Sequence, residues 1–414
     1  MKIIKLITIS FFTLFLITTS VLANCDLTVV NDLERKKDGA VRLLARDNNL
    51  NNSILNKAKD CEVDDILVVT SLQKEFDYFP FVQTLKQAPA GFTSFISEND
   101  SLGIILYEGL ASQLDYYLES NNIEIAENRK IKIDGKKTTA IALMKDTKHL
   151  YYKEDILNKA GIDVPTSYSE VLEAAEIIRS KGILKYPLGD LYNSEWQLAV
   201  QFVNLYLSLD GKLFKKESAK PNFRNDEGIE ALNMMKKYSK FINPELLSGS
   251  KETIEESWST GNIAIGNFWG SQYKSLSTDS NTKTSTALYF NNSLAPASTL
   301  WWKGFTVARY VVESEMMAAL YTMIYAFNDD TISDFNDDAI WIVDGYEDEP
   351  KAAGLMLNEK AGTPSFPVNP YIALLLVSIG SEISDFIIND TKSKKALKKM
   401  EKAYIVLAKN LEYM

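Results

Sequence analysis

Histidine and cysteine, which often supply catalytic bases, nucleophiles and metal ligands, are scarce in this chain. His149 is the only histidine, and it stands in a Lys-Tyr-rich segment without a nucleophile motif. A Ser-His-Asp type of triad would have to use this residue, and we expect a structural role for it instead. Cys25 and Cys61 are too distant in the sequence to complete a zinc ligand set with His149. The sequence therefore predicts no catalytic group, no metal site and no cofactor.

Carboxylate and amide side chains at the ends of predicted strands are better candidates for a site. Gln73 and Glu75 follow a strand predicted over residues 65–70, and Glu108 follows one predicted over 102–107. Ligands of open α/β sheets bind beyond the carboxyl ends of the strands. We therefore expect these three side chains to contact a small polar ligand.

The first 23 residues have the pattern of a secretory signal peptide. Lys2 and Lys5 precede an apolar run, and residues 21–23 form a cleavage site that leaves Asn24 as the new terminus. The pattern predicts export to the periplasm. An uncleaved anchor is one alternative, because the run is nearly long enough to span a bilayer. A lipid anchor on Cys25 is another, because the residues before it nearly match a lipid-attachment motif.

Composition sets further limits on the function. The chain has two cysteines, and in an oxidising exported compartment these predict one disulfide, Cys25–Cys61. Acidic residues outnumber basic ones by 55 to 45, for a net charge of −10, which argues against nucleic acid as a partner. The 414 residues suffice for two domains. Because no later stretch is long and charge-free enough to cross a membrane, the part after the signal is expected to be soluble.

Strand and helix signals alternate along the chain, which indicates an α/β fold. Ser167 and Glu170 predict a capping box, Gly161 a helix end, and Asn225 a helix start. The polar residues 24–63 are predicted to be an N-terminal extension with a helix over 37–46. Strands are predicted over 65–70, 92–97, 102–107, 131–136 and 263–266, an extended segment over 138–152, and the two last helices over 370–388 and 391–411.

One stretch resembles a known family. Residues 150–168 read Leu-Tyr-Tyr-Lys-Glu-Asp-Ile-Leu-Asn-Lys-Ala-Gly-Ile-Asp-Val-Pro-Thr-Ser-Tyr. They are similar to the core signature of family 1 extracellular solute-binding proteins, the maltose-binding-like receptors of ABC importers, although Tyr168 stands where tryptophan is usual. Further similar segments follow in the family's order, at residues 185–189, 195–196, 210–214, 258–270 and 302–307. Residues 24–63 and 329–350 have no counterpart.

The resemblance implies a two-lobed periplasmic-binding-protein-like (type II) α/β fold with a ligand cleft between the lobes. It implies a non-enzymatic, monomeric receptor that binds a sugar and delivers it to the membrane permease of an ABC importer. The chain would cross between the lobes near residues 145–147 and 295–297. The expected divisions are a signal peptide over 1–23, the extension over 24–63, lobe 1 over 64–146 plus 297–345, and lobe 2 over 147–296 plus 346–414.

The resemblance also indicates which residues line the cleft. A sugar presents apolar C–H faces to aromatic rings and a rim of hydroxyls to carboxylates and amides. Trp196, Trp269 and Trp302 match family positions that often line the cleft. Because Trp301 and Trp302 are adjacent on a predicted strand, we expect only one of them to do so. The expected polar contacts, besides those named above, are Asp146 at the crossing and, in the second lobe, Asp190, Asn193, Glu195 and Asn267.

Three other functions stay open at this stage. The same fold could bind a cationic solute such as a polyamine, since the chain is acidic and cation–π contacts suit an aromatic box. An exported carbohydrate-active enzyme would need two opposed carboxylates, one with a raised pKa. An interaction protein could keep the fold while residues 24–63 or 329–350 crowd the cleft.

Overall fold

The computed structural model describes residues 25–34, 39–73, 78–133, 135, 137–216, 218–327, 329–342, 349–389 and 391–414. The predicted signal peptide lies outside these residues. Within them, no helix is both long enough and apolar enough to span a bilayer.

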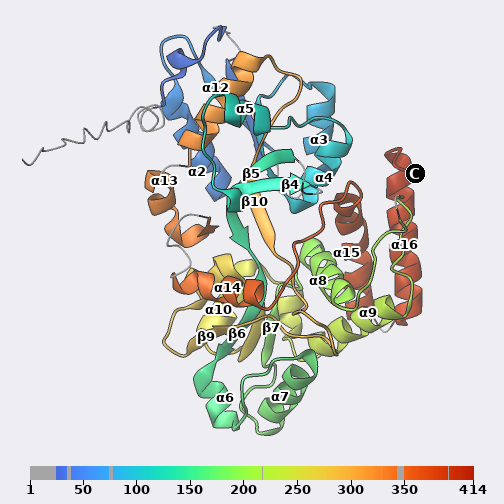
Figure 1. Ribbon diagram of the computed structural model, residues 1–414. Coiled ribbons are helices and arrows are strands. Elements are labelled where there is room, and N and C mark those ends of the chain that lie inside the picture. The colour runs from blue at the N-terminus through green and yellow to red at the C-terminus, as the bar shows by residue number, and fades with distance from the viewer. Residues whose placement is uncertain are drawn as a thin grey trace, which may run out of the picture.

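Two β-sheets form the centres of two lobes (Figure 1). In the described residues the first sheet has seven strands, in the order β11-β5-β10-β3-β1-β2 with β4 paired to β5. β1 is parallel to β2 and β3, whereas β10 is antiparallel to β3 and β5. The strands are β1 (Val41–Arg46), β2 (Val68–Gln73), β3 (Ser94–Glu98), β4 (Lys130–Ile133), β5 (Lys137–Asp146), β10 (Trp301–Val307) and β11 (Ile340–Trp341).

The second sheet has four described strands, in the order β7-β8-β6-β9. β6 is antiparallel to β8 and β9, and β7 is parallel to β8. The strands are β6 (Lys148–Lys153), β7 (Leu188–Asp190), β8 (Ile265–Trp269) and β9 (Thr282–Ser285). The chain passes from the first sheet to the second at Thr147, between β5 and β6, and returns between β9 and β10. The first crossing falls within residues 145–147, and the stretch between β9 and β10 contains residues 295–297, where the family resemblance implied the second.

Helices cover both sheets, as the alternating signals predicted (Figure 1). Those of the first lobe are α2 (Asn49–Ala58), α3 (Tyr78–Gln87), α4 (Asn99–Tyr107), α5 (Asp115–Ser120), α12 (Glu313–Tyr325) and α13 (Asp329–Asp334). Those of the second are α6 (Glu154–Ala160), α7 (Tyr168–Ser180), α8 (Glu195–Ser208), α9 (Asp226–Ser239), α10 (Lys251–Ser259), α11 (Tyr273–Leu276), α14 (Ala353–Lys360), α15 (Ile372–Ile388) and α16 (Ser393–Asn410).

Local signals fixed several helix ends correctly. Ser167 and Glu170 form the predicted capping box of α7, and the Asn225 side chain accepts a hydrogen bond from a backbone N–H of α9. Gly161 ends α6 at a φ of 66°, in the left-handed region that favours glycine.

The strand predicted over residues 102–107 is wrong, because this segment belongs to helix α4. The backbone N–H of Glu98 donates to Ser101 Oγ at 3.0 Å, which helps to end β3 and start the helix. Residues 99–105 are all buried, so the segment lacks the alternation of apolar and polar residues that separates strand from helix. A Cβ atom on Gly103 would lie 2.5 Å from the backbone of Asn369, so glycine permits this close packing.

The N-terminal extension predicted over residues 24–63 is also wrong, because this segment is part of the first lobe. β1 lies inside the first sheet between β2 and β3, and all six of its residues are buried. β1 contains two arginines, and these charged residues made the sequence of the strand look polar. Arg42 is buried in a 3.0 Å ion pair with Glu315, and Arg46 lies 3.3 Å from Asp100.

The predicted disulfide between Cys25 and Cys61 is present, and it encloses β1 and α2. Replacing both cysteines with serine should lower the free energy of unfolding by about 3–4 kcal/mol, because the open chain gains conformational entropy when it unfolds. Urea denaturation of the two proteins measures the difference. Dithiothreitol should destabilise only the wild-type chain, and an unchanged denaturation midpoint in the variant would contradict the prediction.

Candidate functional site

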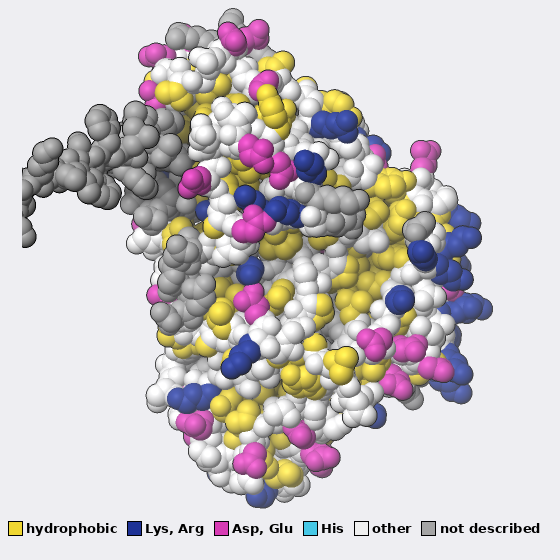
Figure 2. All heavy atoms as spheres, in the orientation of Figure 1, with side chains coloured by type: hydrophobic (Ala, Val, Ile, Leu, Met, Phe, Trp, Pro, Cys, Tyr) yellow, Lys and Arg dark blue, Asp and Glu magenta, His cyan; other side chains and the backbone are white. Residues whose placement is uncertain are grey.

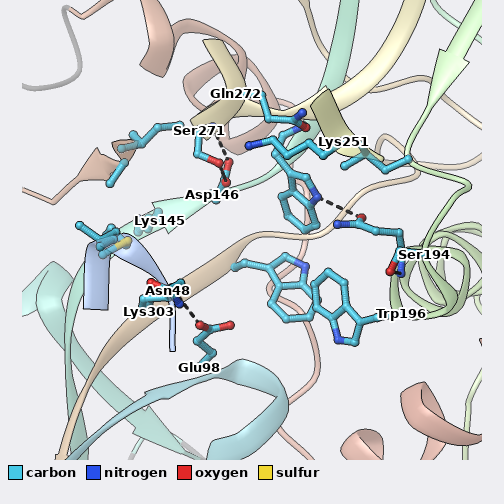
Figure 3. Close-up of a pocket in the computed structure, with 18 of the residues that line it drawn as sticks. Asn48, Glu98, Lys145, Asp146, Ser194, Trp196, Lys251, Ser271, Gln272 and Lys303 are labelled. Carbon is cyan, nitrogen blue, oxygen red and sulfur yellow. Dashed lines mark hydrogen bonds and ion pairs between the residues drawn. The ribbon is translucent and has the colours of Figure 1, made fainter. Parts of the chain in front are cut away.

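A cavity of about 570 Å³ lies between the lobes, and both lobes and the crossing segments line it (Figure 3). The first lobe contributes residues at the ends of β1, β3, β5 and β11. The second contributes the start of α8, the start of α10 and the turn that follows β8. Because the walls belong to different lobes, a ligand held here contacts both of them.

Four tryptophans give the cavity an aromatic wall. Trp196 is the second residue of α8, Trp269 ends β8, and Trp301 begins β10. The ring centroids of Trp196 and Trp301 lie 5.3 Å apart, and those of Trp269 and Trp301 lie 5.8 Å apart at 88°. Such edge-to-face contacts hold aromatic rings in fixed orientations. Trp302, on the other side of β10, also lines the cavity.

The expectation that only one of Trp301 and Trp302 lines the cleft is therefore wrong. Their side chains leave opposite faces of β10 as predicted, since they pack into different apolar clusters. Both still reach the cavity, because β10 begins where the chain crosses between the lobes. Successive side chains on a strand point to opposite faces of the sheet. At the start of β10, however, both faces of the strand border the cavity.

Paired charges also line the cavity. Glu98 lies 3.4 Å from Arg46 and 3.1 Å from Lys303, and all three line the cavity. Burial acts to raise the pKa of Glu98, but Arg46 and Lys303 outweigh it and leave this pKa below its ordinary value. Glu98 is therefore a carboxylate at neutral pH, and it accepts hydrogen bonds beside two strong donors.

Asp146 lies at the first crossing and is held by the second lobe (Figure 3). Its carboxylate accepts hydrogen bonds from the Ser271 hydroxyl at 2.6 Å and from the backbone N–H of Thr147 at 2.8 Å. Burial raises its pKa from 3.8 to about 6, although these hydrogen bonds oppose the shift. Three residues on, burial lowers the pKa of His149 from 6.5 to about 4.

The structure brings only part of the predicted set together. Trp196, Trp269, Trp302, Asp146 and Asn193 line the cavity. Asn193 also donates to the backbone carbonyl of Gly249 at 2.7 Å, which ties the wall to the segment before α10. Whether these side chains contact a ligand stays a prediction.

Asp190 and Asn267 lie behind the cavity wall instead. Asp190 is buried in an ion pair with Lys148, and Asn267 donates to Asp190 at 3.1 Å and to Gln201 at 3.0 Å. Asp190 ends β7 and Asn267 lies in the middle of β8, and the Asn267 side chain points toward Gln201 of α8. Asp190 and Asn267 therefore stabilise the interior of the second lobe. Glu195, the third predicted residue of this lobe that does not line the cavity, is exposed at the start of α8.

Gln73 and Glu108, two of the predicted residues of the first lobe, do not line the cavity either. The third, Glu75, lies outside the described residues. Gln73 donates to Thr84 at 2.6 Å from the edge strand β2, away from the cavity. Glu108 follows a helix and not a strand, and it pairs with Lys86 at 3.0 Å. Arg46, Glu98 and Lys303 were missed, and recognising β1 as a strand would have pointed to Arg46.

Comparisons with known proteins agree with this architecture. The sequence profile of the bacterial extracellular solute-binding protein family matches residues 80–300, more than half of the chain. The chain therefore belongs to this family. A search of curated protein sequences finds no match.

Solved structures of sugar-binding receptors share the fold. Maltose-bound MalE3 from T. maritima has a TM-score of 0.70 at 16% identity, over 89% of this chain and 99% of that one. The ribitol-bound solute-binding protein from Agrobacterium radiobacter K84 has a TM-score of 0.72 at 15% identity, over 90% and 100%. Lmo0181 from Listeria monocytogenes, in complex with cycloalternan, has a TM-score of 0.69 at 16% identity, over 90% and 99%.

The opposite pKa shifts of Asp146 and His149 predict opposite effects of pH on stability. The raised pKa of Asp146 stabilises the folded chain below about pH 4, and this contribution disappears as the pH rises through about 6. The lowered pKa of His149 stabilises the folded chain above about pH 6.5, and this contribution disappears as the pH falls toward 4.

Asp146→Asn should therefore remove the first contribution and leave the second. The unfolding free energy of the wild type minus that of the variant should fall by about 2–3 kcal/mol between pH 4 and pH 7. Urea denaturation of both proteins across this range measures the difference. Parallel pH profiles would show that Asp146 titrates near its ordinary value.

Proposed function

We propose that this protein is an exported receptor that binds a sugar in the inter-lobe cleft and delivers it to the permease of an ABC importer. The observation that carries the proposal is that one cavity is lined both by tryptophan rings and by hydrogen-bonding charged groups. Trp269 and Trp301 offer flat surfaces for C–H faces. Glu98, Arg46 and Lys303 offer an acceptor and donors for hydroxyls.

The charges of the cleft favour a neutral ligand over a polyamine. Each basic side chain that lines the cavity has a carboxylate nearby: Arg46 and Lys303 share Glu98, Lys145 lies 2.7 Å from Glu359, and Lys251 lies 3.4 Å from Glu255. A polyamine receptor needs surplus carboxylates facing its ligand. The whole chain has an excess of acidic residues, but the residues that line the cleft do not.

Binding without catalysis is the second part of the proposal. A glycosidase needs a carboxylic acid that is free to protonate the glycosidic oxygen. Asp146 has the raised pKa, but its two carboxylate oxygens accept hydrogen bonds from Ser271 and Thr147.

We propose further that the receptor acts as a monomer. We also propose that one lobe corresponds to residues 39–146 plus 297–342 and the other to residues 147–296 plus 349–414.

A panel of ligands tests the proposal by thermal denaturation. Maltose, maltotriose, ribitol, tagatose, chitin oligosaccharides, spermidine and amino acids would each be added to the purified chain. A ligand that binds only the folded state raises the melting temperature with the logarithm of its concentration. We expect a saturable increase with one class of sugar. An increase with spermidine alone, or conversion of a sugar to products, would contradict the proposal.

Trp269→Ala should weaken binding of that sugar by roughly tenfold or more, because central aromatic contacts dominate binding energy. Isothermal titration calorimetry measures the affinity directly, independently of any change in the stability of the variant. Trp341→Ala is the matched control, since Trp341 is also buried but does not line the cleft. Equal losses in the two variants would show that Trp269 does not contact the sugar.

A further inference from the structure

The last long helix, α16, carries a row of lysines on its solvent side. Its buried face is formed by Ala396, Leu397, Met400, Tyr404 and Ala408. The helical repeat places its exposed lysines together on the other side. These are Lys394, Lys395, Lys398, Lys399, Lys402 and Lys409. Figure 2 shows the resulting column of basic side chains along the edge of the molecule where Figure 1 places α16.

This row is unfavourable for the isolated helix. Lys394, Lys398 and Lys402 follow one another at i,i+4 spacing, where like charges repel by about 0.2–0.5 kcal/mol per pair. Lys399 has a partner, Asp385, at 2.8 Å. Among the described residues, no carboxylate lies within ion-pair distance of Lys394, Lys395, Lys398 or Lys402. Asp385 also attracts Lys395 electrostatically, so the described part of the chain relieves the repulsion only at one end of the row.

A second segment, nearly 200 residues earlier, extends the same basic face. The Tyr404 hydroxyl of α16 donates to the Ala219 carbonyl at 2.7 Å, and the Tyr404 and Phe214 rings lie 5.7 Å apart. These contacts hold the loop between α8 and α9 against α16. Lys212, Lys215 and Lys220 of this loop are exposed. Two distant segments thus bring exposed lysines close to one another in a chain whose net charge is −10.

Apolar surface accompanies these charges. A hollow of about 550 Å³ lies in the loop region, where Phe214, Pro370 and Tyr371 provide apolar lining beside Lys212 and Lys215. On α16, Val406 is 49% exposed between lysines. Lysines beside exposed apolar groups suit the interface of a bilayer, where the ammonium groups meet phosphates and the apolar groups enter the headgroup layer.

We propose that this basic face, formed by the lysines of α16 together with Lys212, Lys215 and Lys220, binds the surface of a membrane that contains anionic phospholipids. The helix presents its lysines over about 22 Å, which suits many headgroups on a flat surface better than one compact ligand. Each lysine near such a surface contributes about fivefold in affinity, equivalent to about 1 kcal/mol. The face shares no residue with the cleft lining, so cleft and face can be occupied together.

Vesicle co-sedimentation of the purified chain tests this proposal. The probes are phosphatidylcholine vesicles with and without 30 mol% phosphatidylglycerol, in 50 mM and 500 mM NaCl. We expect binding only to the anionic vesicles, with loss at high salt because screening weakens surface electrostatics. A quadruple variant, Lys394→Gln, Lys398→Gln, Lys402→Gln and Lys409→Gln, should bind at least tenfold more weakly.

The matched control changes four exposed lysines elsewhere and alters the net charge equally. It replaces Lys137, Lys159, Lys185 and Lys240 with glutamine and should bind within twofold of the wild type. A melting temperature of the α16 variant no lower than that of the wild type would show that it folds. Absence of binding to anionic vesicles at 50 mM NaCl, or equal losses in the two quadruple variants, would overturn the proposal.

Discussion

The architecture depends on a buried set of hydrogen bonds where the chain crosses between its two sheets. Thr147, at the first crossing, lies 3.0 Å from the Ser298 hydroxyl of the second. Asn358, on α14, donates to the Thr147 hydroxyl and to the Lys148 carbonyl, both at 3.0 Å. All four residues are almost completely buried. A buried polar group without a partner costs about 1–3 kcal/mol, so these bonds fix how the crossing segments lie against one another.

The composition of the cleft follows from this arrangement. β5 and β10 cross side by side, so the residues at their ends face the same space from both lobes. Asp146 is the last residue of β5 and Trp301 the first of β10, and both line the cavity. Because Ser271 of the second lobe donates to Asp146, the protonation state of this carboxyl affects a contact between the lobes. A ligand held in the cavity would therefore contact the residues at which the two lobes are joined, the arrangement in which hinge closure around a ligand can occur.

The sequence predicted the architecture better than the site. Caps such as Ser167 and Asn225 act through neighbouring residues, so their signals are local and were correct. β1 was missed because its arginines are neutralised by Glu315 and Asp100, which lie far away in the sequence. The tryptophans could be placed because the family resemblance supplied their position, whereas Asp146 is the one predicted carboxylate of the described residues that lines the cavity. Asp190 is buried in the core, where it contacts Lys148 and Asn267, whereas Asp146 lines the cavity. The sequence could not distinguish these two aspartates, because only tertiary packing decides which one is buried.

Small-angle X-ray scattering in solution tests the central claim, that a sugar binds between the lobes and draws them together. The chain would be measured alone and with increasing amounts of the sugar that raises its melting temperature most. We predict a saturable decrease in the radius of gyration that follows the calorimetric binding curve. A sugar that binds with one-to-one stoichiometry and leaves the radius of gyration unchanged would contradict the account.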